Sequence, residues 1–165
     1  MENKNQSLHE VVITAIIVKN GKYLITKRSM KEKRFPGFWT VPGGKLETDD
    51  YIHIPKETEH YWYNVLEKVL RKEVHDEVGL EIKNIEYLTS LARIHEDKNP
   101  SLVISCIADY DSGKVKLQKD EAEDFTWVTL KEARSYNLID GIFDELVLAE
   151  KKRKGIKEEW QRSTK

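Results

Sequence analysis

The chain has 165 residues, of which 39% are hydrophobic and 35% charged, a length that suits one domain over residues 1–165 rather than two. The net charge of −1 excludes the strong positive field of general nucleic-acid or membrane-surface binders. The apolar runs are far shorter than the roughly 20 residues that cross a bilayer, and the polar start MENKNQSLHE lacks a secretory signal. We therefore expect a cytoplasmic protein with no membrane partner, in which the single cysteine, Cys106, is a buried, inert thiol.

The first elements along the chain are two strands. The β-branched run Val11–Val18 ends at Asn20-Gly21, and the alternating segment Tyr23–Thr26 follows. This pattern predicts a hairpin with a primed two-residue turn. Further along, segments rich in β-branched or aromatic residues predict strands over Ile85–Ile94, Leu102–Asp109 and Phe125–Val128.

Two longer segments have the pattern of helices. From about Lys56 to Val78 there is no glycine or proline, apolar residues recur at helical spacing, and Gly79 follows as a cap. A second helix is predicted over about Ile142–Lys154 and a short one over Lys131–Tyr136. Order is expected from about residue 8 to about residue 155, with polar tails at both ends. The sequence of elements favours the α/β (α+β) class, with a mixed sheet between helices.

Three acidic residues lie together on the long predicted helix. Helical projection places Glu73 and Glu77 within the apolar arc, with Asp76 on the same flank. Like charges at this spacing destabilise a helix by about 0.2–0.5 kcal/mol, so the cluster either takes up protons or binds a cation. Carboxylates without His or Cys suit Mg²⁺ or Mn²⁺. An ordinary solvated face paired with Lys68 or Lys72 is the alternative that these residues alone leave open.

A glycine pair precedes this helix. Pro42-Gly43-Gly44 follows the aromatic strand candidate Phe38–Val41, and paired glycines let a backbone come close to a ligand. A tight turn out of a strand is the ordinary alternative. Only the combination of this loop with the acidic helix indicates a binding site.

Together these segments resemble the signature of the Nudix hydrolase family. The family's box runs Gly, five residues, Glu, seven residues, then Arg-Glu-aliphatic-any-Glu-Glu-any-Gly-aliphatic. Lys72–Leu80 fits the second half at seven of nine positions, with Lys72 replacing the arginine and Asp76 replacing one glutamate. The segment FWTVPGGKLE of this chain resembles the strand and loop that open the box, with Gly44 as the box glycine. This resemblance implies a Nudix-type α/β/α sandwich with a mixed central sheet.

The sequence departs from the family pattern between the two halves of the box. The pattern has 13 residues there, whereas 27 residues separate Gly44 from Lys72, so an insertion covers about residues 48–61. Counting forward, the first box glutamate falls on Asp50, and counting backward it falls on Asn64. Other candidates for the missing carboxylate are Glu47, Glu57 and Glu59. The aromatic residues of the insertion are either packing or a lid over the substrate.

The resemblance also implies an activity and the residues that carry it. Nudix enzymes hydrolyse a pyrophosphate bond in a nucleoside diphosphate linked to another group, and Mg²⁺ held by the box carboxylates supports this chemistry. By this likeness the metal ligands are the Gly44 carbonyl, Glu73, Asp76 and Glu77. The catalytic residues are Glu73, Glu77 and Glu121, with Glu123 as an alternative to Glu121.

The expected substrate contacts are carried over in the same way. Arg28 matches the place from which family members contact a phosphate, Gly43 and Gly44 bring the backbone close to the ligand, and Trp39 can stack on a base. Core packing is the alternative for Trp39. Mn²⁺ is a possible substitute for Mg²⁺.

The expected substrate is a nucleoside triphosphate, cleaved to the monophosphate and pyrophosphate, because the chain has little beyond the core domain. The alternatives are a catalytically weak nucleotide sensor and an RNA-end or cap hydrolase recruited by the basic tail KKRKGIKEEWQR. A solvated helix end is the more ordinary explanation of that tail. We expect a nucleotide as the partner, no nucleic acid, and a monomer or homodimer.

Overall fold

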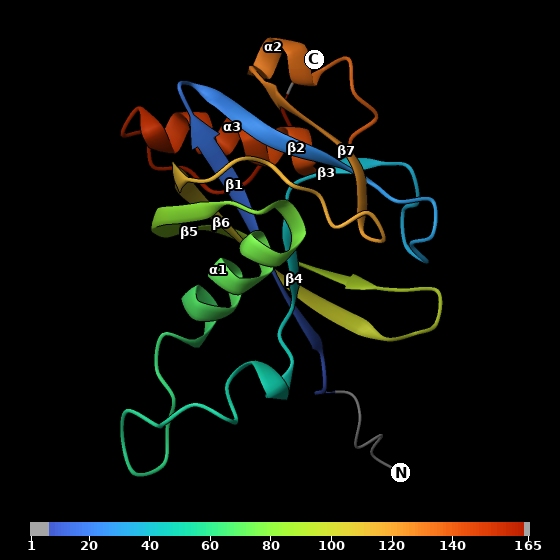
Figure 1. Cartoon of the computed structure of the whole chain (residues 1–165). Coiled ribbons are helices and arrows are strands. Elements are labelled where there is room, and N and C mark those ends of the chain that lie inside the picture. The colour runs from blue at the N-terminus through green and yellow to red at the C-terminus, as the bar shows by residue number, and fades with distance from the viewer. Residues whose placement is uncertain (1–6, 164–165) are drawn as a thin grey trace.

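The computed structural model describes residues 7–163; residues 1–6, which belong to the polar N-terminal segment, and residues 164–165 lie outside this range. The elements in chain order are β1 (Glu10–Lys19), β2 (Lys22–Arg28), β3 (Trp39–Thr40), β4 (Gly43–Lys45), the 3₁₀ turn η1 (Thr48–Asp50), α1 (Val65–Val78), β5 (Glu81–Ile94), β6 (Pro100–Ser112), β7 (Ala122–Val128), α2 (Leu130–Ala133) and α3 (Ile142–Arg153) (Figure 1). No helix within residues 7–163 has the length and hydropathy needed to cross a membrane.

The sheet is mixed, as predicted. Its strand order is β3-β2-β1-β6-β5, while β4 pairs with β1 and β7 pairs with β2. β1 runs antiparallel to β2 and β4 but parallel to β6, from the pair Glu10 and Ser101 to the pair Val18 and Asp109. The glycine loop, part of β4, is therefore held directly against β1, a central strand of the sheet.

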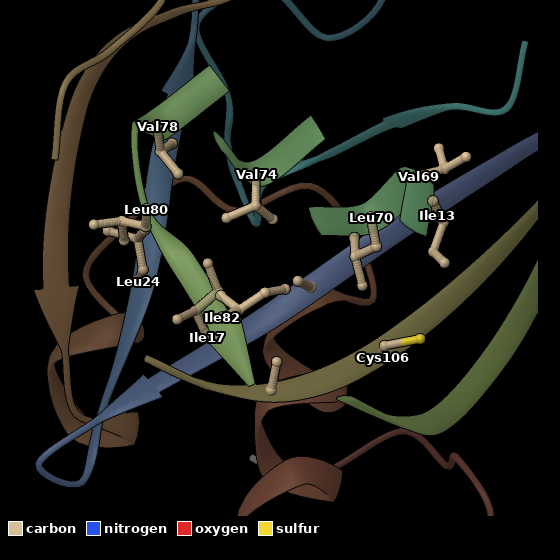
Figure 2. Packing of buried hydrophobic residues seen from close by; sticks show 12 residues of the cluster. Ile13, Ile17, Leu24, Val69, Leu70, Val74, Val78, Leu80, Ile82 and Cys106 are labelled. Carbon is tan, nitrogen blue, oxygen red and sulfur yellow. The ribbon is translucent and has the colours of Figure 1, made fainter. Parts of the chain in front are cut away.

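Helices cover both faces of the sheet (Figure 1). On one face, Val74 of α1 shares a buried cluster with Ile17 of β1 (Figure 2). On the other face, Leu146 of α3 shares a cluster with Ile16 of the same strand. Side chains alternate between the faces of a strand, so one β-branched run enters two cores. Each buried aliphatic side chain stabilises the fold by about 1.5–3 kcal/mol. The predicted α/β/α sandwich is confirmed.

Three local predictions are confirmed. Asn20 and Gly21 have φ values of 50° and 72°, the left-handed pair that a primed hairpin turn requires. Gly79, also at φ 72°, caps α1 and donates its N–H to the carbonyl of His75. Cys106 is buried, and burial raises the pKa of its thiol to about 11.

The long helix starts later than predicted. α1 begins at Val65 rather than near Lys56, and Asn64 before it has a left-handed φ of 54°. Upstream, the hydroxyl oxygen of Thr58 accepts a hydrogen bond from the N–H of Tyr61 at 3.0 Å. Such side-chain bonds to the backbone compete with helical ones, and they fold the first part of the predicted helix into a loop.

The C-terminal region also differs from expectation. The short helix ends at Ala133, well before Tyr136. The expectation that order ends near residue 155 is wrong, because Arg162 donates to Asp144 at 2.9 Å and the N–H of Ser163 donates to it at 2.7 Å. Asp144 is buried on α3, and a buried carboxylate is costly without such partners. The tail therefore folds back onto α3.

Candidate metal and nucleotide site

Glu77, on the last turn of α1, is a buried acidic residue of the predicted site. Only 8% of it is exposed, and its Oε2 accepts a hydrogen bond from the N–H of Gly43 at 3.0 Å. Burial raises the pKa of Glu77 to about 8; the Gly43 N–H opposes this rise, and the Glu121 carboxylate adds to it. Burial therefore favours the protonated form of this carboxyl group until a cation binds.

Glu73 lies one turn earlier on α1, directly against Gly44 of β4. A Cβ atom on Gly44 would lie 2.0 Å from Oε2 of Glu73, so this close approach requires glycine. Burial raises the pKa of Glu73, while Lys72 opposes the rise. The two glycines thus have separate structural roles: Gly43 donates to one glutamate, and Gly44 makes room for the other.

Glu121 reaches the same carboxylates from the segment before β7. Its carbonyl accepts the N–H of Ser29 at 2.9 Å, which ties this segment to the end of β2. Burial raises the pKa of the Glu121 side chain, and the Glu73 carboxylate raises it further. The alternative, Glu123, instead pairs with Lys27 at 2.8 Å. The structure therefore brings Glu121, rather than Glu123, to Glu73.

Arg28 places a positive charge beside these acids. Its Nε donates to the carbonyl of Arg34 at 2.8 Å, and its Nη2 donates to Glu32 at 2.9 Å. The guanidinium lies near enough to lower the pKa values of Glu77 and Glu121 in opposition to burial. Sequence reasoning missed Glu32, for which a spacing of four residues from Arg28 was the only signal.

Lys72 binds the carboxylates on the outer side of the site. Its Nζ lies 3.3 Å from Asp50, 3.3 Å from Glu73 and 3.4 Å from Asp76. Burial lowers the pKa of the ammonium group, but the carboxylates of Glu73 and Asp50 outweigh it and the pKa is raised. Lys72 therefore remains charged and holds Glu73 and Asp76 together.

Lys72 replaces the arginine of the family's box. It contacts Asp50, the residue on which the first box glutamate falls when counting forward from Gly44. The side chain of Asp50 is 7% exposed, and its Oδ2 accepts the N–H of Glu47 at 2.8 Å. The other candidates are engaged elsewhere or exposed: Glu47 caps the turn η1, Asn64 caps α1, Glu57 pairs with a lysine of α1, and Glu59 is exposed. The contact of Asp50 with Lys72 favours the forward count, and which carboxylate replaces the first box glutamate stays a prediction.

The donor set at this site suits a hard divalent cation, because it consists of carboxylate oxygens and backbone carbonyls. Within residues 7–163, no three His, Cys, Asp or Glu side chains have the compact arrangement of a metal cluster; here the Lys72 ammonium binds Glu73 and Asp76. The raised pKa values of Glu73 and Glu77 mark carboxyl groups whose ionised form a cation would stabilise. The residues fit Mg²⁺ on these grounds.

The predicted aromatic contacts have other partners in the structure. The ring of Trp39 meets Tyr136 edge-on, with centroids 4.9 Å apart, and packs against the α3-side core. Its contact with a base stays a prediction. In the insertion, Tyr51 and Trp62 pack on each other at 5.3 Å, which favours the packing alternative over the lid for these two residues.

The sequence is similar to a known family and to curated proteins. The model of the NUDIX domain family matches residues 8–149. The NAD-capped RNA hydrolase NudC of Actinobacillus succinogenes is 34% identical over 124 residues, which cover 72% of this chain and 40% of that protein. This chain therefore spans less than half the length of that curated relative.

Solved structures share the fold. A MutT NUDIX hydrolase from Burkholderia pseudomallei superposes with a TM-score of 0.68 at 22% identity, covering 86% of this chain and 98% of that one. The Nudix domain of Shewanella oneidensis NrtR, solved as a complex with ADP-ribose, gives a TM-score of 0.68 at 16% identity over 93% of this chain and 94% of that one.

Proposed function

This chain belongs to the Nudix family, and from that premise we propose that it is a Mg²⁺-dependent hydrolase of a pyrophosphate bond in a nucleoside diphosphate derivative. The observation that supports this most is the meeting of Glu73 and Glu77 with the glycine pair, where a side chain on Gly44 would displace the Glu73 carboxylate. The proposed ligands are these two glutamates, Asp76 and the Gly44 carbonyl. Mn²⁺ is the expected substitute.

Each proposed role follows from a contact in the site. When bound, Mg²⁺ neutralises phosphate charge and polarises the oxygens around the bond that breaks. Arg28, oriented by Glu32 and the Arg34 carbonyl, binds a phosphate through its remaining N–H groups. A carboxylate oxygen of Glu121 accepts a proton from the attacking water, and its raised pKa moves it toward the range of an effective general base. Glu73 is the alternative base.

Two substrates are the main candidates. A nucleoside triphosphate, cleaved to the monophosphate and pyrophosphate, is the expectation from the sequence. A dinucleotide joined by a pyrophosphate, such as NAD, is favoured by the name of the NudC relative, an NAD-capped RNA hydrolase. Both contain the same chemical target, a nucleoside monophosphate in anhydride linkage to a second phosphate. A cytoplasmic location stays a prediction.

The structure gives little support to recruitment of RNA by the basic tail. The four cations of the KKRK run are paired with carboxylates: Lys151 with Glu158, Lys152 with Glu86, Arg153 with Asp109 and Lys154 with Glu150. Cations that are already paired have less net charge to offer to a phosphate backbone. If a capped RNA is the substrate, we therefore propose that its cap rather than its chain is recognised.

The test is a substrate panel with the purified full chain and Mg²⁺. Nucleoside triphosphates, NAD, ADP-ribose, nucleotide sugars and NAD-capped RNA are compared, each with Glu77→Gln as the control. Release of pyrophosphate from a nucleoside triphosphate identifies a nucleoside triphosphate pyrophosphohydrolase. Release of two mononucleotides from NAD identifies a dinucleotide pyrophosphohydrolase. We expect Glu77→Gln to lower the rate by orders of magnitude while circular dichroism stays unchanged; an unchanged rate would show that the metal site is wrong.

The same experiment separates an enzyme from a sensor. A catalytically weak sensor would bind a nucleotide, measured by calorimetry, and release no product with either Mg²⁺ or Mn²⁺. Turnover that depends on the metal excludes that alternative.

A further inference from the structure

β5 is an edge strand with an unusual degree of exposure. Within residues 7–163, β6 is the only strand that pairs with it. The loop end of the β5–β6 hairpin projects away from α1 and α3 (Figure 1), and residues 90–94 are exposed throughout, on both faces. Natural proteins normally protect such an edge, because its free N–H and C=O groups can pair with another chain.

The exposed edge is also apolar. Tyr87 is 60% exposed, Leu91 43% and Ile94 76%. Between β5 and α3 a groove of about 280 Å³ opens beside the strand, and its apolar lining includes Leu88 and Leu148. A strand with this composition favours a partner that supplies both backbone hydrogen bonds and apolar side chains.

We propose that this partner is a second copy of the chain, paired antiparallel along β5 about a two-fold axis at Ser90. An isologous contact of this kind places each residue opposite the residue at the symmetric position of the other copy. The register of β5 against β6 shifts between Tyr87 and Thr89, so Leu88 and Thr89 together count as one position. With the axis at Ser90, Glu86 then lies opposite Arg93 of the second copy, and this contact occurs twice.

The faces of the sheet agree with this register. Glu86 pairs with Ile107 of β6, and Arg93 with Ser101. Ile107 belongs to the α3-side core, and Ser101 lies six residues away, on the same face of a period-two strand. Glu86 and Arg93 of the two copies therefore meet on one side of the extended sheet. By the same count, Leu91 of one copy lies opposite Leu88 of the other, beside the groove.

The opposite face is matched as well. Tyr87 pairs with Cys106 and Ala92 with Leu102, so both side chains point to the α1 side, and in this register they oppose each other across the two copies. Ile85, which packs against the α1-side core, opposes Ile94 of the second copy. The interface thus has apolar pairs on both faces and opposite charges at symmetric positions.

Arg93 is prepared for such a contact. The central carbon of its guanidinium lies over the ring of Phe35, 4.4 Å from the centroid, in a cation–π contact. This contact leaves N–H groups of the guanidinium for a carboxylate. The nearby acids Glu10 and Asp97 pair with Arg34 instead, while Glu86 has only Lys152 at 3.5 Å among its described partners.

The charges select this register over its neighbour. The register of β5 against β6 also shifts between Lys83 and Glu86, so Asn84 and Ile85 count as one position. If the axis then moves one position toward the start of β5, Lys83 falls opposite Arg93, and like charges directly opposite each other destabilise a sheet. Edge charges usually prevent pairing. In β5 the nearest charges on the two sides of Ser90, Glu86 and Arg93, have opposite signs, so they favour one antiparallel self-pairing.

The experiment measures the mass of the full chain by sedimentation over a wide concentration range. We expect a species of twice the 19.4 kDa chain mass to grow with concentration. Glu86→Arg or Arg93→Glu should each raise the dimer dissociation constant at least about tenfold, because each places two like-charge pairs across the axis. Glu59→Arg, an exposed site in the insertion, carries the same charge change as Glu86→Arg and should leave the mass unchanged.

The two reversed variants also provide a rescue. An equimolar mixture of Glu86→Arg and Arg93→Glu chains restores opposite charges at both contacts, so a heterodimer should form where neither variant forms a homodimer. Circular dichroism confirms that each variant is folded. A chain that stays at 19.4 kDa at every concentration, or a dimer that neither reversal weakens, would refute pairing through β5.

Discussion

Replacing Glu77 by glutamine should stabilise the metal-free protein, although it removes a proposed metal ligand. The carboxyl group is 8% exposed, and burial raises its pKa from 4.5 to about 8. The folded chain therefore holds this proton more tightly than the unfolded chain. Its contribution to stability is full below pH 4.5 and is lost as the pH rises through about 8.

The size of the effect follows from the distance between the two pKa values. At pH 7, which is 2.5 units above the ordinary pKa of 4.5, the Glu77 carboxyl group is ionised in the unfolded chain and mostly protonated in the folded chain. This difference lowers the free energy of unfolding by about 3 kcal/mol from its value below pH 4.5. Glutamine does not ionise, and its amide oxygen can still accept the N–H of Gly43. The variant should therefore avoid most of this loss.

The assay is urea unfolding, followed by tryptophan fluorescence, in EDTA at about pH 5, 7 and 8.5. Between pH 4.5 and 8, the difference in unfolding free energy between Glu77→Gln and the natural chain should grow by about 1.4 kcal/mol per pH unit. Glu67→Gln, exposed on the same helix, is the matched control and should show no such growth. Added Mg²⁺ should stabilise the natural chain more than the Glu77→Gln variant.

One result would refute this reasoning. If Glu77→Gln is less stable than the natural chain by the same amount at every pH, the carboxyl group is ionised in the folded state. Its burial would then not raise its pKa, and the Gly43 N–H would dominate its environment.

Three further predictions concern the site and the tail. Gly44→Ala should lower the rate by orders of magnitude, measured with the substrate that the panel identifies, because its methyl group displaces the adjacent glutamate; full activity would contradict the packing. Asp50→Asn should weaken Mg²⁺ binding by about tenfold in calorimetry, as outer partners of metal ligands do, whereas Glu57→Gln should leave it unchanged. Truncation after Gly155 should lower the unfolding free energy by about 1–3 kcal/mol, because it removes the partners of Asp144; equal stability would show that the tail does not dock in solution.

The sequence predicts the fold best where neighbouring residues decide the conformation. Asn20-Gly21 and Gly79 act through their own backbone angles, so the turn and the helix end follow from local rules. β4 is different, because a glycine pair disfavours a strand; Gly43 and Gly44 are extended since they pair with Thr14 and Ile13 of β1. Such long-range pairing has no signal in the local sequence.

The candidate site shows the same division. Glu73 and Glu77 share one helix, so their common face could be predicted from spacing. The choice between Asp50 and Asn64 could not, because it depends on how the insertion folds. The contact of Asp50 with Lys72 joins segments on either side of that insertion, and only the structure brings them together.

The parallel pairing of β1 and β6 has a consequence for synthesis of the chain. Glu10 meets Ser101, about 90 positions later, and a ribosome adds roughly 5–20 residues per second. The β1–β2 hairpin can close within microseconds, yet the other edge of β1 waits several seconds for its partner strand. During that interval the nascent chain displays its most apolar strand with one edge open, so we expect its yield in cells to depend on chaperone supply and translation speed more than on the stability of the finished fold.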